Sequence, residues 1–507
     1  MKKILGSEAL IKSLLEEGVD TIFGYPGGAI MPIYDSLYSY QDKINHILTR
    51  HEQGAIHAAQ GYSRVSGKVG VCFATSGPGA TNLITGIADA QIDSTPLVCI
   101  TGQVPSQLLG TDAFQESDVI GISMPVTKWN YQITSSDEIG EIISKAFYIA
   151  RSGRPGPVLI DITKDAQFSE VDFNYKKCER IRSYHPYPII NDKKIKKASK
   201  LINKAKKPLI LVGQGVLLSN AENELIEFSE ITGIPLASTL LGLSAVSCDH
   251  KNYVGYLGMH GNYGPNVKTN EADLIIAIGM RFDDRVTGDT SKYAVNAKII
   301  HIEIDPSEID KIIKTDVAIN ADAKEALIGL NKIVQKNSHE EWINEFRECD
   351  KLEFDKIINK EINGSYDKLS MAEVIHKISE FTQGKSIIVT DVGQHQMVAS
   401  RYYKFTEPNS NITSGGLGTM GFALPAAMGS KIGNPNREVI AVIGDGGIQM
   451  TIQELATISQ YSIGVKILIL NNNFLGMVRQ WQELFFDNRY SFTEMKNPNF
   501  NKITDGY

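Results

Sequence analysis

The sequence alternates short apolar runs with helix-like segments, and it repeats this alternation in three blocks. Runs such as VGVCFAT at 69–75, LIIAIG at 274–279 and VKILIL at 465–470 contain almost no charge. Strands of a parallel sheet are covered by helices on both faces, so they appear as continuous apolar runs rather than as alternating ones. The sequence therefore predicts an α/β protein with three doubly wound parallel sheets.

Two charged stretches, 167–190 and 335–368, separate the three blocks. The expected domains are 1–166, 190–335 and 366–507. Three domains also agree with about 150 residues per domain in a chain of 507 residues. After Phe486 no further strand is predicted, so we expect the third domain to lack a C-terminal tail. The first residues enter an amphipathic helix directly, unlike a targeting peptide.

Composition excludes several classes of function. Acidic residues outnumber basic residues 58 to 51, which gives a formal net charge of −7. No block of lysine and arginine is dense enough to neutralise a run of phosphates, so we expect small-molecule substrates rather than nucleic acid. The uncharged stretches are rich in glycine, serine and threonine, and no membrane span is predicted. Five scattered cysteines without a CxxC pair argue against a disulfide framework and a zinc site and favour the cytoplasm.

The most informative motif is GDG at 444–446, which is followed by paired asparagines one strand–helix–strand crossover later. The two strands of a right-handed crossover are parallel, so Asp445 and Asn472 are expected at the carboxyl ends of neighbouring strands. Their oxygens and the nearby main-chain carbonyl of Phe474 suit Mg²⁺. The glycines that would let a diphosphate approach the backbone are Gly444, Gly446 and Gly447. For GDG alone, the ordinary alternative is an aspartate that caps a strand-to-helix turn.

This pair of motifs resembles the fingerprint of thiamine diphosphate enzymes, and the resemblance implies a partner residue. Such enzymes need a glutamate from a separate α/β domain, which hydrogen-bonds the aminopyrimidine of the cofactor and promotes loss of the thiazolium proton. Glu52, within ILTRHEQGAIHAAQGYSR at 47–64, matches that position. Taken alone, Glu52 would be an acidic residue in the first turn of a helix.

Seven further strings narrow the resemblance to one family. They are GYPGG (24–28), TSGPGATN (75–82), GTDAFQE (110–116), RFDDRVTG (281–288), VGQHQM (392–397), GGLGTMGFALPAA (415–427) and LGMVRQWQ (475–482). Together they resemble the catalytic large subunits of the acetohydroxyacid synthase, or acetolactate synthase, family over essentially the whole chain. The resemblance implies a carboligase that decarboxylates pyruvate on thiamine diphosphate and Mg²⁺. It would join the two-carbon unit to a second pyruvate or to 2-ketobutyrate, the first common step of valine, leucine and isoleucine biosynthesis.

The resemblance also implies roles for individual residues. Arg285 would face the carboxylate of the acceptor, and Trp481 would shape the pocket for the larger 2-ketobutyrate. The residues that would border the reaction space are Gly28, Phe114, Gln115 and Lys164. Those that would contact thiamine diphosphate are Pro26, Gly27, Gly77, Gln394, His395, Gly418, Met420 and Met477. The ordinary alternatives are core packing for the apolar side chains and surface ion pairs or solvation for Arg285 and Lys164.

The middle block contains VGQGVLL at 212–218, which has two glycines of a dinucleotide fingerprint but Leu218 in place of the third. In the family that this chain resembles, the middle domain binds FAD without a net redox role in the reaction. The matching residues are Gly213, Gly215, Met259, His260, Gly279, Arg281 and Asp305. Taken alone, Asp305 would be a cap at the end of a strand.

Four other functions are alternatives. A pyruvate oxidase and an FAD-free catabolic acetolactate synthase are both disfavoured by RFDDRVTG and GMVRQWQ. A non-catalytic binding subunit would have no use for Glu52, Asp445 and Asn472 together, and a nicotinamide oxidoreductase is disfavoured by the incomplete glycine turn. The resemblance implies a homodimer or a dimer of dimers with active sites at the interface, and a regulatory small subunit as a further partner.

Overall fold

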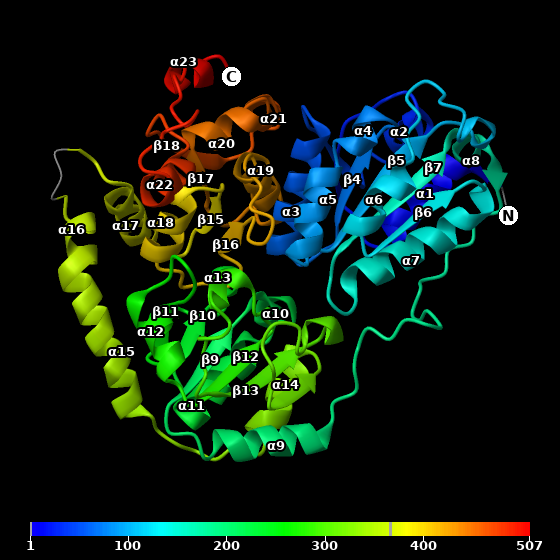
Figure 1. Ribbon diagram of the computed structural model, residues 1–507. Helices are drawn as coiled ribbons and strands as arrows, with labels where there is room; N and C mark the ends of the chain where they lie inside the picture. The colour runs from blue at the N-terminus through cyan, green and yellow to red at the C-terminus, as the bar shows by residue number, and fades with distance from the viewer. Residues whose placement is uncertain (1–2, 365–367) are drawn as a thin grey trace. The chain divides into compact units, whose positions relative to one another are not determined.

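The computed structural model describes residues 3–364 and 368–507, and the chain forms two compact units. The first unit consists of Met1–His185, Ile388–Gly393 and Ile412–Tyr507, and the second of Pro186–Ile387 and Gln394–Asn411. In Figure 1 the first unit therefore carries both ends of the colour scale, blue to cyan and orange to red. Among the described residues, none of the helices is long and apolar enough to cross a membrane.

The amino-terminal sheet has six parallel strands in the order β3-β2-β4-β5-β7-β6. The strands are β2 (Thr21–Gly24), β3 (Asn45–Leu48), β4 (Gly70–Ala74), β5 (Leu97–Gln103), β6 (Trp129–Ile133) and β7 (Pro157–Thr163). One face is covered by α1 (Gly6–Glu16), α2 (Met31–Tyr38) and α7 (Ile139–Arg151), and the other by α3 (Glu52–Ser66) and α5 (Ile84–Ile92). The shorter elements are β1 (Ile4–Leu5), α4 (Pro78–Thr81), α6 (Val119–Ser123), α8 (Lys164–Phe168) and β8 (Glu170–Val171).

Strand β4 shows why this sheet needs apolar residues at every position. Successive side chains of a strand point to opposite faces. Val71 and Phe73 pack in the core that contains α1, α2 and α7, whereas Cys72 and Ala74 pack in the core that contains α3 and α5. Because both faces are buried, no position is left for a solvated side chain, and the prediction of doubly wound sheets is confirmed.

The carboxyl-terminal sheet has four strands in the order β16-β15-β17-β18. The strands are β15 (Ile387–Thr390), β16 (Asn411–Thr413), β17 (Val439–Gly444) and β18 (Val465–Leu470). Strands β17 and β18 are parallel, and the crossover between them contains α20 (Asp445–Met450) and α21 (Glu454–Gln460). The remaining helices of this part are α19 (Ala423–Gly433), α22 (Gly476–Phe485) and α23 (Phe500–Thr504).

Helices α3 and α19 join the two sheets of the first unit. A Cβ atom on Gly61 would lie 1.9 Å from the carbonyl oxygen of Ala426, and one on Gly429 would lie 1.8 Å from that of Ala58. The backbones of the two helices therefore approach each other through glycines, and a larger residue at either position would push the helices apart.

The second unit contains the middle sheet, six parallel strands in the order β11-β10-β9-β12-β13-β14. The strands are β9 (Pro208–Val212), β10 (Leu236–Ser238), β11 (Tyr253–Tyr256), β12 (Leu274–Ile278), β13 (Lys298–Glu303) and β14 (Val317–Asn320). The main helices are α9 (Asp192–Ile202), α11 (Glu222–Thr232), α12 (Tyr263–Glu271), α14 (Ala323–Asn331) and α15 (Glu340–Glu353). The shorter or later ones are α10 (Gln214–Leu218), α13 (Asp284–Thr287), α16 (Asn359–Ile362), α17 (Met371–Thr382) and α18 (Gln394–Tyr402).

Residues 340–362, most of the charged stretch between the second and third predicted domains, are helical. Trp342 and Phe346 on α15 are buried in one core of the middle sheet, and Trp342 Nε1 donates to the carbonyl oxygen of Pro208 at 2.9 Å. The many charged residues of α15 thus form the solvated face of a helix whose aromatic side chains anchor it to the sheet.

Candidate active site

One edge of the amino-terminal sheet collects most of the site residues predicted for the first domain. All six strands are parallel, so the segments that follow them begin at the same edge. Pro26–Gly28 follow β2, Glu52 follows β3 and Gly77 follows β4, while Lys164 is the first residue of α8 directly after β7. The topology therefore brings residues far apart in the sequence to one end of the sheet.

Glu52 is the first residue of α3 and only 9% of its surface is exposed. The preceding residue, His51, caps the helix by accepting the N–H of Gln53 on Nδ1 at 3.1 Å. Asn82 Nδ2 donates to Glu52 Oε2 at 3.0 Å. Within the described parts of the chain, no group donates a hydrogen bond to Oε1. One carboxyl oxygen is thus held in place, and the other is available to a ligand.

Glycines clear the space beside this carboxyl group. A Cβ atom on Gly79 would lie 3.3 Å from Glu52 Oε1, and one on Gly27 would lie 2.5 Å from the side chain of Thr75. Gly77 has a φ of +57°, and a Cβ atom there would lie 2.8 Å from the carbonyl oxygen of Gln115. The TSGPG turn therefore lies against the backbone of the 110–116 loop, and the GYPGG turn lies against the side chain of Thr75.

The 110–116 loop presents an apolar side chain to solvent. Phe114 is 87% exposed, and Gln115 has a positive φ of 58°. The carboxylate of Glu116 accepts the backbone N–H groups of Gly110, Thr111 and Ala113, which lowers its pKa and holds the loop together. The exposed aromatic ring is thus carried by a loop with internal hydrogen bonds.

The carboxyl-terminal sheet brings a second set of oxygens together. Asp445 follows β17 and is 2% exposed, and Asn471 and Asn473 follow β18. The Nδ2 atom of Asn497 donates to Asp445 Oδ2 at 2.6 Å, to Asn471 Oδ1 at 3.0 Å and to Asn473 Oδ1 at 3.1 Å. Three oxygens from two strand ends therefore converge on one nitrogen.

Asn472 is turned differently from its two neighbours. Its Oδ1 accepts the N–H of Phe474 at 3.0 Å. Residues 474 and 494 form an isolated antiparallel bridge, which brings the chain after α22 back over the end of β18. Asn497 belongs to this returning segment and has no local sequence signal that would mark it as a site residue.

The donor set around Asp445 fits a hard divalent cation. Across residues 3–364 and 368–507, no three His, Cys, Asp or Glu side chains cluster as metal ligands, so a cation here would rely on one carboxylate and neutral oxygens. Mg²⁺ is commonly held by one or two carboxylates together with water and phosphate oxygens. The oxygens that converge beside Asp445 therefore suit Mg²⁺ that is bound together with a diphosphate.

The glycines after β17 leave no room for side chains. A Cβ atom on Gly447 would lie 2.8 Å from the carboxylate of Asp391, and one on Gly446 would lie 3.0 Å from Leu475 and 3.5 Å from Met420. Met420 and the Gly444–Gly447 turn are thus neighbours. Gly418, in the same loop as Met420, has a φ of +70°.

Asp391 is a site residue that the sequence analysis missed. It follows β15, is fully buried, and accepts the N–H groups of Val392, Gly421 and Ala423. Burial raises the pKa of Asp391 to about 6, although the three backbone hydrogen bonds act to lower it. It ends an apolar run just as Asp445 does, so the same strand-end argument would have found it.

Glu454 links the two sheets next to Glu52. It is a fully buried residue of α21, and its carboxylate accepts the N–H of Arg50 at 3.0 Å and the hydroxyl of Thr457 at 2.7 Å. A Cβ atom on Gly54 would lie 2.3 Å from Glu454 Oε1. Burial raises the pKa of Glu454, and the carboxyl group holds the turn from which α3 starts.

The last predicted residues of the first unit lie on α22, which carries Met477 and Trp481. Trp481 is 42% exposed, and its ring lies 5.2 Å from that of Phe485, centroid to centroid. By contrast, Gln394 and His395 begin α18, which belongs to the second unit.

In the second unit the predicted glycines lie at the carboxyl ends of β9 and β12. Gly213 donates its N–H to Ile278, Gly215 donates to the carbonyl oxygen of Gly279 at 2.9 Å, and Gly279 has a φ of +57°. A Cβ atom on Gly213 would lie 2.1 Å from that same carbonyl oxygen. The two strand ends are therefore packed backbone to backbone.

The other predicted residues of this unit lie on loops at the same end of the middle sheet. Met259 donates its N–H to Arg285 at 2.8 Å, and Arg285 Nη1 lies 3.5 Å from the sulfur of Met259. His260 and Arg281 are partly exposed, and Asp305 caps a short 3₁₀ turn by accepting the N–H and hydroxyl of Ser307. Small backbone turns beside the cationic Arg281 fit the diphosphate of a dinucleotide.

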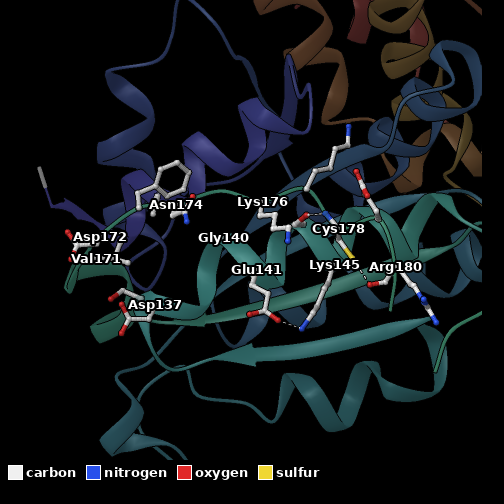
Figure 2. Close-up of a pocket in the computed structure, with 16 residues that line it drawn as sticks. Asp137, Gly140, Glu141, Lys145, Val171, Asp172, Asn174, Lys176, Cys178 and Arg180 are labelled. Carbon is white, nitrogen blue, oxygen red and sulfur yellow. Dashed lines mark hydrogen bonds and ion pairs between the residues drawn. The ribbon is translucent and has the colours of Figure 1, made fainter. Parts of the chain in front are cut away.

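A cavity of about 570 Å³ lies elsewhere in the first unit, between α7 and the segment 171–180 (Figure 2). Its wall mixes cations such as Lys145 with anions such as Glu141, which form an ion pair. No residue predicted to bind substrate, cofactor or metal lines this cavity. The strand ends, rather than this cavity, are therefore the candidate active site.

Comparison with known proteins shows the family to which the three parts of the chain belong. Three family models match the chain in order: the thiamine pyrophosphate enzyme N-terminal TPP binding domain at residues 4–122, the central domain at 195–330 and the C-terminal TPP binding domain at 391–507. The first contains Glu52 and the third contains Asp445. The chain therefore has the three domains of a thiamine diphosphate enzyme.

Curated relatives match over the whole chain. The acetolactate synthase large subunit of Corynebacterium glutamicum is 47% identical over 515 residues, which cover 100% of this chain and 82% of the relative. That of Lactococcus lactis is 46% identical over 511 residues, covering 100% of this chain and 87% of the relative. A probable acetolactate synthase large subunit of Methanocaldococcus jannaschii is 46% identical over 514 residues, which cover 99% of this chain and 86% of the relative. The chain belongs to the acetolactate synthase large subunits, a family of thiamine diphosphate enzymes.

Proposed function

We propose that this chain converts two molecules of pyruvate into one of acetolactate and one of CO₂, and that it accepts 2-ketobutyrate in place of the second pyruvate. The observation that carries the proposal is the buried carboxyl group of Glu52, which has one oxygen held by Asn82 and the other without a donor among the described residues. A carboxyl group in this state can exchange a proton with a bound cofactor.

The residues of the chain divide the remaining tasks between them. When bound, thiamine diphosphate supplies the electron sink that decarboxylation needs. Glu52 holds and returns a proton at Oε1, while Asn82 keeps its carboxyl plane fixed. Asp445 and the asparagines after β18 would hold Mg²⁺, which would supply positive charge for the diphosphate of the cofactor. Arg285 binds the carboxylate of the acceptor ketoacid as a charge-assisted pair.

Product analysis tests the proposal. The purified chain is given pyruvate, thiamine diphosphate, Mg²⁺ and FAD, and the products are separated and identified. Acetolactate and CO₂ are expected. Acetate or acetyl phosphate with uptake of oxygen would instead indicate a pyruvate oxidase, and would contradict the proposal.

FAD belongs to the proposal as a bound group of the middle domain. The support is the glycine turn of Gly213, Gly215 and Gly279 beside Arg281, which suits a diphosphate-bearing dinucleotide. The purified chain should therefore be yellow and release flavin on denaturation. Acetolactate formation by a chain free of flavin absorbance would support the FAD-free alternative.

We expect Trp481→Leu to lower the preference for 2-ketobutyrate over pyruvate as acceptor by about tenfold, because a lost apolar wall changes binding of one extra methylene group by about that factor. The two ketoacids are supplied together, and the ratio of acetohydroxybutyrate to acetolactate is measured. Phe381→Leu, which removes a 91% exposed aromatic ring on α17, is the matched control. An unchanged ratio in Trp481→Leu contradicts the assigned role.

Asn497→Ala should lower the concentration of Mg²⁺ that half-saturates thiamine diphosphate binding by about fivefold. The amide of Asn497 donates to the oxygens that a cation would use, so each must exchange a hydrogen bond for the metal. Calorimetric titration of Mg²⁺ measures this, with Asn501→Ala, an exposed residue of α23, as the control. A higher requirement for Mg²⁺ in Asn497→Ala would mean that the side chain supports the metal instead.

The proposed function includes an assembly of several subunits. The chain forms a homodimer or a dimer of dimers, with each active site made between two copies, and a small regulatory subunit is a further partner. Helix α22 supports such an interface because Val478, Leu484 and Phe485 are each at least half exposed. The scattered, unpaired cysteines support a cytoplasmic location.

A further inference from the structure

The loop from Thr413 to Met420 is held by side chains from helices of the amino-terminal part and from the residue that follows α5. Asp93, directly after α5, accepts the N–H of Gly415 at 2.8 Å and that of Gly416 at 2.7 Å. Asp89, one turn earlier on α5, accepts the hydroxyls of Ser414 and Thr419. Two carboxyl groups thus hold both ends of the loop that carries Gly418.

Arg64 completes this group of side chains. It lies in the last turn of α3, pairs with Asp93 at 2.9 Å, and donates from Nη1 to the carbonyl oxygen of Thr413 at 2.5 Å. Its Nε atom donates to the hydroxyl of Thr95 at 3.0 Å. We call Arg64, Asp89 and Asp93 the loop clamp.

The loop clamp is costly to bury, which argues against an incidental role. Asp89 and Asp93 are fully buried, and the side chain of Arg64, which pairs with Asp93, is 6% exposed, so this ion pair and a second carboxyl group lie away from water. Burial raises the pKa of Asp93, against the opposing effect of Arg64. Within the described parts of the chain, Asp89 Oδ2 has no hydrogen-bond partner. Buried ion pairs seldom add stability over apolar packing, so such a group is more readily explained by the geometry that it imposes.

We propose that Asp93 and Asp89 are positioning residues for thiamine diphosphate, which act by fixing the loop of Gly418 and Met420. The proposal rests on the proposed function, in which this loop supports the aminopyrimidine. Arg64 anchors the clamp to α3, the same helix whose first residue is Glu52.

The test compares Asp93→Asn with Glu17→Gln in the full chain. Glu17 is a matched control because its side chain is also fully buried and paired with an arginine, Arg151, at 2.7 Å. It lies just before β2, at the sheet edge opposite to Glu52. Both substitutions remove one buried charge from the amino-terminal part, so both are expected to lower the melting temperature.

Two measurements distinguish positioning from a merely structural role. The first is hydrogen–deuterium exchange of the peptide that covers residues 413–422, without added cofactor. The second is the dissociation constant of thiamine diphosphate at saturating Mg²⁺, followed by calorimetry. Asp93→Asn should lose the protection of the Gly415 and Gly416 amides and bind thiamine diphosphate about tenfold more weakly, whereas Glu17→Gln should match the unmodified chain in both.

A milder variant covers the case in which Asp93→Asn does not fold. Thr419→Val keeps the shape of the side chain and every charge but removes the hydrogen bond to Asp89. It should weaken binding of thiamine diphosphate about threefold to fivefold. If neither Asp93→Asn nor Thr419→Val changes the affinity for thiamine diphosphate or the hydrogen exchange of residues 413–422, the positioning role of the clamp is overturned and the proposed function is not affected. No binding of thiamine diphosphate by the unmodified chain would overturn the proposed function and the clamp with it.

Discussion

Glu52→Gln is expected to retain thiamine diphosphate and to lose turnover by about 10²-fold to 10⁴-fold, the usual contribution of a positioned acid–base group. Glutamine has the size of glutamate and can still accept the Nδ2 donor of Asn82, so the local structure should persist. What it cannot do is hold and release a proton at the position of Oε1. The rate of acetolactate formation and the dissociation constant of thiamine diphosphate measure the two effects separately.

The control for this substitution is Glu17→Gln, which removes another buried carboxylate of the same part of the chain. It should keep the rate of the unmodified protein. Loss of cofactor binding in Glu52→Gln would show that the carboxyl group serves the fold rather than the proton transfer. A rate like that of the unmodified chain would remove Glu52 from the mechanism.

The position of Asp445 could be predicted because the rule behind it is local, whereas Glu52 is identified from the resemblance to thiamine diphosphate enzymes. An apolar run marks a buried strand, and in a parallel sheet the residue after the run lies at the edge where ligands bind. Asp445 directly follows the buried run of β17, and Glu52, four residues beyond the end of β3, begins α3 at the corresponding edge of its own sheet. Asp391 obeys the same rule, because it directly follows the apolar run SIIVT at 386–390.

Asn497, Asp89 and Asp93 could not be found in this way. Asn497 contacts Asp445 across 52 residues, and Asp93 contacts Gly415 across 322. No periodicity or turn signal links positions so far apart, since the contact of Asn497 depends on the return of the chain after α22, and those of Asp89 and Asp93 depend on how α5 packs against the carboxyl-terminal part. The orientation of Asn472 could not be predicted either. Three consecutive asparagines have the same chemistry, and only the backbone of the turn after β18 decides which of their side chains face Asp445.

Asp445→Ala is expected to weaken the binding of Mg²⁺ and thiamine diphosphate together by more than about 100-fold, since even indirect supports of a metal site are worth about 10-fold to 100-fold. The substitution removes the one carboxylate from the oxygen cluster and leaves neutral amide oxygens, which bind a divalent cation weakly. Calorimetry with Mg²⁺ and thiamine diphosphate measures the loss. Asp445→Asn keeps an oxygen but not the charge, so its affinity should be intermediate; near-normal affinity in the alanine variant would place the metal elsewhere.

Mixing the two inactive variants then tests where the active site is completed. If a site combines Glu52 of one copy with Asp445 of another, a dimer of one Glu52→Gln chain and one Asp445→Ala chain contains one site with both residues intact. Equal amounts with free exchange give mixed dimers in half of the population, so about a quarter of the unmodified activity should return. If each site lies within a single chain, every site lacks one residue and the mixture stays inactive. The outcome therefore decides between a site shared by two copies and a site within one, independently of which ketoacid is the acceptor.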